Sequence, residues 1–132
     1  MTQSNRTLPI IWAALTVSHL FHLAMGELSQ KQAEEADPIL VIGLCIAGLS
    51  TLILSLFVVP KNIKATKPEQ LTTIFIIQWV LIESTGIFGL IARFMGAHAM
   101  IQYGMMGLAF VGMLFTFPSD KVQRDMLQGG AQ

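Results

Sequence analysis

The sequence predicts an all-α membrane protein in which four transmembrane helices form an antiparallel bundle. Three observations predict this fold class. Hydrophobic residues make up 53% of the 132 residues, and charged residues make up 12%, against roughly 25% in ordinary soluble domains. The mean hydropathy is +0.62. The hydrophobic residues also fall into long blocks with most charges between them, which indicates that lipid surrounds the chain.

Four blocks are long enough to cross a bilayer, which takes roughly 17–25 apolar residues. They cover residues 8–25, 39–59, 71–94 and 97–117. Each is predicted to be a helix, because a backbone in hydrocarbon must satisfy its own hydrogen bonds. The prolines agree with these boundaries, since all stand at block edges: Pro9, Pro38, Pro60, Pro68 and Pro118. We expect residues 1–132 to form a single transmembrane domain.

Lysine and arginine predict the orientation, because cytoplasmic loops carry an excess of both. One side of the predicted membrane has only Lys31 and Arg93. The other side has the remaining six: Arg6, Lys61, Lys64, Lys67, Lys121 and Arg124. Both termini are therefore predicted to be cytoplasmic, in an inner or plasma membrane. A cleaved secretory signal is the alternative for the first block, and the histidines within its apolar stretch argue against it.

The clearest candidate for function is Glu83, because an ionisable side chain in a membrane is costly and is by default a functional hypothesis. It lies 12 residues from Leu71 and 11 from Phe94, near the middle of its predicted helix. Arg93 is roughly 15 Å further along that helix, and no lysine or arginine is expected at the depth of Glu83. We therefore expect an unpaired carboxyl group that gains and loses a proton; the alternative is a protonated Glu83 that only hydrogen-bonds to a neighbouring helix. Ser84 and Thr85, the polar residues beside it, complete the predicted ion-binding site.

A second polar group is predicted in the outer half of the membrane. His19 and His22 are three residues apart and so share a helix face. Counting inward along the last span places Gln102 at about the depth of His22. Interhelical hydrogen bonding is the plain interpretation, and a hydrated path toward Glu83 is another. A metal site is not predicted, because two imidazoles are an incomplete ligand set.

Small residues occur repeatedly in the second, third and fourth predicted spans. They predict close helix packing, because small side chains let helices approach each other in lipid. The expected contact positions are Gly43, Gly48, Gly86, Gly89, Gly104, Gly107 and Gly112. A small bundle with so many of them is also expected to form a homo-oligomer or to bind other membrane subunits.

Residues 67–94 carry a local pattern. The segment reads Lys67-Pro68-Glu69, then an apolar run, then ESTGIFGLIA from Glu83 to Ala92. It resembles the carboxylate-bearing helix of the rotary ATPase c subunit, the proteolipid, where a polar loop with a basic residue and a proline precedes a helix with an acid followed by small residues. The resemblance implies that Glu83 takes the place of the ion-carrying carboxylate in a ring of subunits. The preceding helix departs from the family, with only Gly43 and Gly48 where a glycine-rich repeat is expected.

Two functional hypotheses follow. In the first, the chain is a c-subunit-like protein in which Glu83 binds a proton or cation within an oligomeric assembly. In the second, it is a structural or accessory subunit of a larger membrane complex and transports nothing. A membrane enzyme or haem protein using His19 and His22 is a third and weaker hypothesis. The sequence contains no nucleotide-binding loop and no nucleophile motif. Its formal net charge is zero, which does not favour binding to nucleic acid. No cofactor is predicted.

Overall fold

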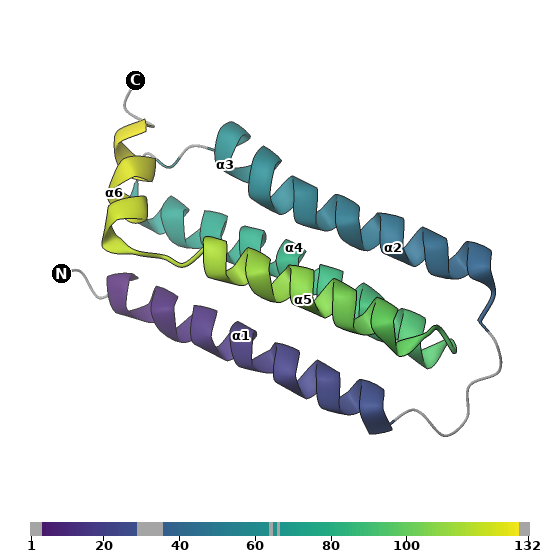
Figure 1. The fold of residues 1–132 in the computed structure, drawn as a ribbon. Helices are drawn as coiled ribbons and strands as arrows, with labels where there is room; N and C mark the ends of the chain where they lie inside the picture. The colour runs from purple at the N-terminus through teal and green to yellow at the C-terminus, as the bar shows by residue number, and fades with distance from the viewer. Residues whose placement is uncertain (1–3, 29–35, 64, 66, 130–132) are drawn as a thin grey trace.

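The computed structural model describes residues 4–28, 36–63, 65 and 67–129. Every regular element in these ranges is helical. Four long segments run side by side, and successive ones point in opposite directions (Figure 1). They are α1 (Ser4–Leu28), α2 (Pro38–Ile53) with its extension, α4 (Pro68–Phe94) and α5 (Ala99–Phe115). The extension of α2 is a π-helical turn, η1 (Leu54–Val58), and a short helix, α3 (Val59–Asn62); α6 (Asp120–Gly129) ends the described chain.

Three helical segments are long and apolar enough to cross a membrane: Thr7–Leu28, Pro38–Asn62 and Glu69–Phe94. Helix α5 is also apolar but shorter, at 17 residues. The all-helical prediction is therefore confirmed, together with three of the segments expected to span. The positions of Lys31 and Lys64, which entered the predicted orientation, lie outside the described residues.

Local sequence explains where the helices begin. Asp37 precedes α2, and its carboxylate accepts a hydrogen bond from the Ile39 N–H at 2.9 Å, while Pro38 occupies the first turn, where it costs no hydrogen bond. At α5 the cap is the His98 ring, which accepts from the Met100 N–H at 3.3 Å. Gly96 has φ of 91°, a conformation that glycine adopts without steric cost. This turn lets α5 reverse direction directly after α4.

Pro60 does not end the second helix, contrary to its predicted place at a helix edge. The chain passes through the π-helical turn η1 and continues to Asn62. The wider turn suits a proline that follows it, because proline has no N–H to donate. Ser55 donates to the Gln78 carbonyl at 2.8 Å, and the Gln78 amide donates to the Ser55 carbonyl at 3.1 Å. This reciprocal pair joins η1 to α4 and satisfies the polar Gln78.

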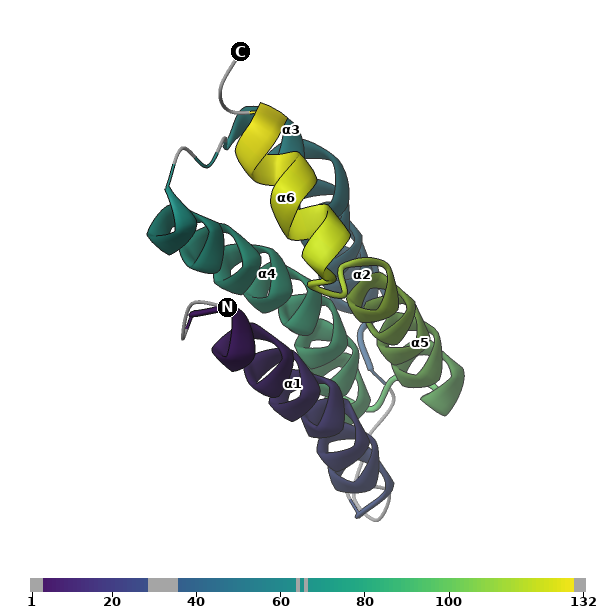
Figure 2. The same cartoon turned by 90° about the vertical axis from the view of Figure 1, so that its left-hand side faces the viewer.

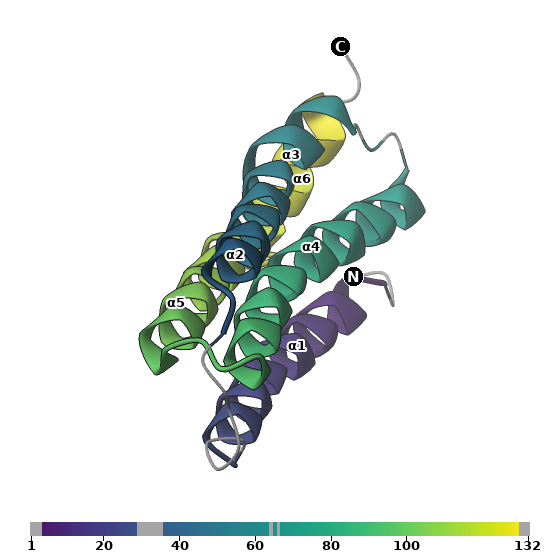
Figure 3. The same ribbon diagram turned by 90° about the vertical axis from the view of Figure 1, so that its right-hand side faces the viewer.

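Helix α4 is the centre of the packing. It contacts α1, α2 and α5, and views from two opposite sides show it between α1 on one side and α2 with α5 on the other (Figures 2 and 3). Phe75, Trp79 and Ile82 of α4 are fully buried. By contrast, α1, α2 and η1 expose large apolar side chains such as Leu20, Ile42 and Phe57, as expected for surfaces that face lipid.

The C-terminal helix α6 is not anticipated from the sequence, whose hydrophobic blocks end at residue 117. It turns away from the axis of α5, at the end of the molecule that also holds the N-terminus and α3 (Figure 1). Met126 and Leu127 pack against the main core, while Lys121, Arg124 and Asp125 are exposed. The apolar pair at the spacing of one helical turn, Val122 and Met126, is the signal that would have found this helix.

Four of the seven predicted packing glycines lie at helix contacts. A Cβ atom at Gly48, Gly86, Gly89 or Gly112 would come within 4 Å of another helix. For the other three, the prediction is wrong within one chain: a Cβ at Gly43, Gly104 or Gly107 meets no described atom within 4 Å. These three residues are exposed, because no described side chain of a neighbouring helix packs closely on them.

Replacing Gly89 with alanine is expected to lower the free energy of unfolding by about 1–3 kcal/mol. The new Cβ would lie 2.7 Å from the Met105 Cβ and 3.4 Å from the Gln102 carbonyl oxygen, so α5 would have to move as a whole. The matched control is Gly43→Ala, which meets open space and gains about 0.5–1 kcal/mol of helix propensity. Unfolding in mixed detergent micelles measures both, and equal stabilities would contradict the α4–α5 packing.

Candidate functional site

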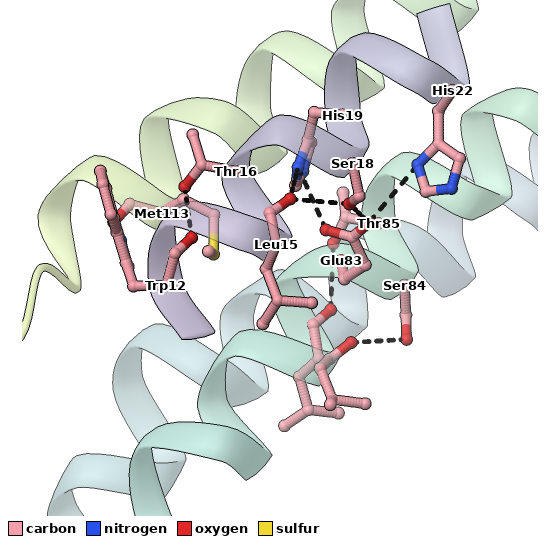
Figure 4. A network of polar contacts seen from close by, with 12 residues as sticks. Trp12, Leu15, Thr16, Ser18, His19, His22, Glu83, Ser84, Thr85 and Met113 are labelled. Carbon is pink, nitrogen blue, oxygen red and sulfur yellow. Dashed lines mark hydrogen bonds and ion pairs between the residues drawn. The ribbon is translucent and has the colours of Figure 1, made fainter. Parts of the chain in front are cut away.

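Glu83 extends from α4 toward α1, where three polar side chains of a single helix face meet it (Figure 4). Ser18 and His19 stand four and three residues before His22, so each shares a side of α1 with His22, and Glu83 lies between them. One Glu83 carboxylate oxygen, Oε2, lies 3.1 Å from the His19 Nδ1 atom. The other, Oε1, lies 3.4 Å from the His22 Nδ1 atom and accepts a hydrogen bond from the Ser18 hydroxyl. We call Ser18, His19, His22 and Glu83 the Glu83 cluster.

The cluster lies in the interior of the molecule. Glu83 is 8% exposed and His19 is 2% exposed, whereas the side chain of His22 is 20% exposed. Charges at low exposure attract each other more strongly than charges in water, because the surrounding dielectric constant is lower. His22 is thus the member of the cluster that solvent or another molecule reaches most easily.

The hydrogen-bond geometry indicates which nitrogen of His19 carries a proton. Its Nδ1 atom lies 3.0 Å from the Leu15 carbonyl oxygen and 3.1 Å from Glu83 Oε2. Both neighbours are acceptors, so we assign the proton to Nδ1. Glu83 Oε2 and His19 Nδ1 are close enough for an ion pair, but they are not aligned for a hydrogen bond. The contact between Glu83 Oε1 and His22 Nδ1 is of the same kind. Attraction between these groups therefore depends on charge.

The structure corrects the expectation that Glu83 has no partner. Among the described residues, no lysine or arginine forms an ion pair with it, but His19 and His22 lie within ion-pair distance. Depth counted along straight helix axes places the histidines further out than Glu83. Side chains extend several ångströms from their axes, and α1 packs directly against α4. Residues assigned to different depths are consequently in contact.

Ser84 and Thr85 do not join Glu83, although the three were predicted to share an ion-binding site. Ser84 donates to the Val80 carbonyl of its own helix at 2.8 Å. Thr85 is buried against α2 and donates to the Gly48 carbonyl at 2.9 Å. Successive residues of a helix are about 100° apart around its axis, so three in a row cannot face one partner.

Gln102 lies beside the cluster, as its predicted depth suggested. It is fully buried, and its amide nitrogen donates to the His22 carbonyl oxygen at 3.2 Å. It therefore ties α5 to the backbone of α1 and does not contact either imidazole ring through a hydrogen bond. The structure brings His19, His22 and Gln102 together, as predicted. Glu83 lies with them, although it was predicted to belong to a separate site with Ser84 and Thr85.

The cluster places two imidazoles, which are bases, close to one carboxyl group, which is an acid. Groups of these kinds can bind a proton and transfer it to one another. In the described ranges, no group of three or more histidine, cysteine, aspartate and glutamate residues is arranged to hold a metal ion. Cys45 is a half-buried free thiol on α2.

Comparison of the chain with protein-family models, with curated proteins and with solved structures finds no match.

Proposed function

We propose that this protein is a membrane protein that binds and exchanges a proton at Glu83, with His19 and His22 as its partners. The observation that carries the proposal is the position of a buried carboxylate within 3.1 Å and 3.4 Å of two imidazole nitrogens. An acid and a base in contact can hold a proton on either one with little rearrangement. Ionisable groups of this kind within transmembrane helices typically mark ion pathways.

The membrane arrangement that we propose has four antiparallel spans: α1, α2 with its extension, α4 and α5. The 17 residues of α5 correspond to roughly 25 Å of helix, and flanking residues complete the crossing. Four basic residues are exposed at one end of this bundle. They are Lys61 in α3, Lys67 just before α4, and Lys121 and Arg124 in α6. The excess of positive charge supports placing this end, with both termini, in the cytoplasm of an inner or plasma membrane.

The proton would enter from the outer side. His22 is the more exposed of the two histidines and lies further along α1 toward the outer end than His19. A proton taken up there would meet Glu83 Oε1 next, and His19 would hold the opposite carboxylate oxygen. The route uses only contacts already present between α1 and α4.

A c-subunit-like ring is the assembly that the sequence resemblance suggests, with Glu83 as the carrier of a proton or cation. Native mass spectrometry from mild detergent tests it by counting the copies in the intact complex. A closed ring of many identical copies supports a rotor. A monomer, or one copy among different subunits, would contradict the ring while leaving the proton-binding proposal to its own test.

The second candidate function is a non-transporting accessory subunit. It is favoured by one observation: Glu83 turns inward to α1 of the same chain and already receives a hydrogen bond from Ser18. In that case the carboxyl group joins two helices, and the large exposed apolar surface of α2 would contact lipid or a neighbouring subunit. Purified protein that carries no proton across liposomes would favour this function over the first.

A further inference from the structure

The hydroxyl group of Ser18 has two hydrogen-bond acceptors within reach (Figure 4). Its Oγ atom lies 2.7 Å from the carbonyl oxygen of Leu15, about one turn earlier on α1. The same atom contacts Glu83 Oε1 on α4. A hydroxyl group has a single hydrogen to donate, and its oxygen can also accept. Ser18 can therefore donate to the carbonyl or to the carboxylate, but not to both at once.

The two carboxylate oxygens of Glu83 have different neighbours. Oε2 lies 3.1 Å from His19 Nδ1, the nitrogen to which we assign a proton, so this oxygen faces a donor. Oε1 faces the Ser18 hydroxyl, which can either donate or accept. His22 Nδ1 lies 3.4 Å from Oε1 but is not aligned for a hydrogen bond. When the carboxyl group is protonated, its hydrogen consequently finds an aligned acceptor on the Oε1 side.

We infer that Ser18 is a positioning residue for the proton exchange at Glu83, and that its hydroxyl turns from Glu83 to Leu15 when the proton binds. In the ionised state, Ser18 donates to Oε1. When a proton arrives, an O–H bond forms on Oε1, and the carboxyl group donates this hydrogen to Ser18 Oγ. Ser18 then donates its own hydrogen to the Leu15 carbonyl. No bond of Ser18 breaks, because only its hydroxyl rotates.

The rotation keeps the hydrogens of Ser18 and Glu83 paired in both states. This matters because Glu83 is 8% exposed, and a buried polar group that loses its partner costs free energy. A donor that cannot accept, such as a backbone N–H, would pair with the carboxylate but would face the hydrogen of the protonated carboxyl group. A hydroxyl group avoids this conflict without any movement of α1 or α4, since the turn occurs about its Cβ–Oγ bond.

Three variants separate this role from a structural one. Ser18→Ala removes the hydroxyl, and Ser18→Thr keeps it; Ser18 is half-buried, which leaves room for the added methyl group. The matched control is Ser84→Ala. Ser84 follows Glu83 in the chain and donates to the Val80 carbonyl of its own helix at 2.8 Å, so its replacement removes a similar bond away from the carboxyl group. Alanine favours helix, so both alanine variants are expected to fold.

Infrared difference spectra between low and high pH, recorded on the full chain in lipid nanodiscs, measure these hydrogen bonds. The carboxyl C=O band that Glu83→Gln removes belongs to Glu83. We expect Ser18→Ala to shift this band to higher wavenumber, because the carboxyl hydrogen loses its acceptor. Ser84→Ala and Ser18→Thr should leave it in place. In the unmodified protein, the O–H band that Ser18→Ala removes should shift to higher wavenumber when Glu83 is protonated, because a neutral carbonyl is a weaker acceptor than a carboxylate.

This inference rests on the proposed function, and the spectra distinguish the failure of one from the failure of the other. A spectrum with no band that Glu83→Gln removes would contradict proton binding at Glu83, and the role of Ser18 with it. If the Glu83 band is present, three results would overturn the role of Ser18 alone: an unchanged band in Ser18→Ala, an equal shift in Ser84→Ala, or a Ser18 O–H band that does not move on protonation.

Discussion

Replacing Glu83 with glutamine is expected to reduce proton flux in liposomes containing the purified protein to the level of protein-free liposomes. Glutamine has nearly the same volume and still accepts the Ser18 hydrogen bond through its carbonyl oxygen. Its amide does not ionise, so it neither binds nor releases a proton. The change therefore removes the proposed chemistry while preserving the shape of the contact between α1 and α4. A pH-sensitive dye inside the liposomes, with a potassium-diffusion potential as driving force, gives the rate.

The matched control is Glu69→Gln. Glu69 is in the first turn of the same helix and is exposed, so its replacement removes the same charge away from the cluster. The control should conduct like the unmodified protein. Unchanged flux in Glu83→Gln would refute the proton-exchange function. Flux lost equally in both variants would show a general effect of charge and would count against a specific role for Glu83.

Replacing Trp79 with alanine is expected to cause the largest loss of stability, about 3–5 kcal/mol in the free energy of unfolding. The indole is fully buried in the middle of the packing. It lies 5.4 Å from the Phe75 ring, centroid to centroid, and donates to the Thr116 carbonyl oxygen at 3.3 Å. Alanine would leave a cavity that neither lipid nor water fills, and the dispersion contacts of its lining would be lost.

Phe115→Ala is the control, since Phe115 is 80% exposed and its truncation changes a surface expected to face lipid. Its effect should stay within about 0.5 kcal/mol. Titration with a denaturing detergent, followed by circular dichroism, measures both variants. Similar losses in the two would contradict the central position of α4 in the packing.

The fold was predictable where it depends on local composition. Long apolar blocks between charged segments specify helices in lipid, and Pro38 and Asp37 mark a helix start without any knowledge of the tertiary structure. Gly48 and Gly89 were correctly expected at contacts. Gly104 and Gly107 were not distinguishable from them, because a glycine on a helix has the same local chemistry whether its face meets another helix or lipid.

The candidate site was predictable only in part. The cost of an acid in the membrane singled out Glu83, and helical spacing placed His19 and His22 on one face. Their contact was missed, because depth along an axis carries no information about tilt, rotation or side-chain reach. The prediction that Ser84 and Thr85 share a site with Glu83 was wrong for a related reason. Side chains of adjacent residues on a helix point in different directions, whereas side chains from another helix can meet at one point.

The sequence by itself determined that the chain is helical, that its long apolar segments suit lipid, and that a carboxyl group lies within one of them. These properties follow from hydrophobicity and backbone hydrogen bonding, which act over a few residues. The tertiary structure alone decided that Glu83 faces Ser18, His19 and His22, and that Thr85 turns to α2. Those outcomes depend on the rotation of each helix about its axis, which is set by side-chain packing between segments far apart in the chain.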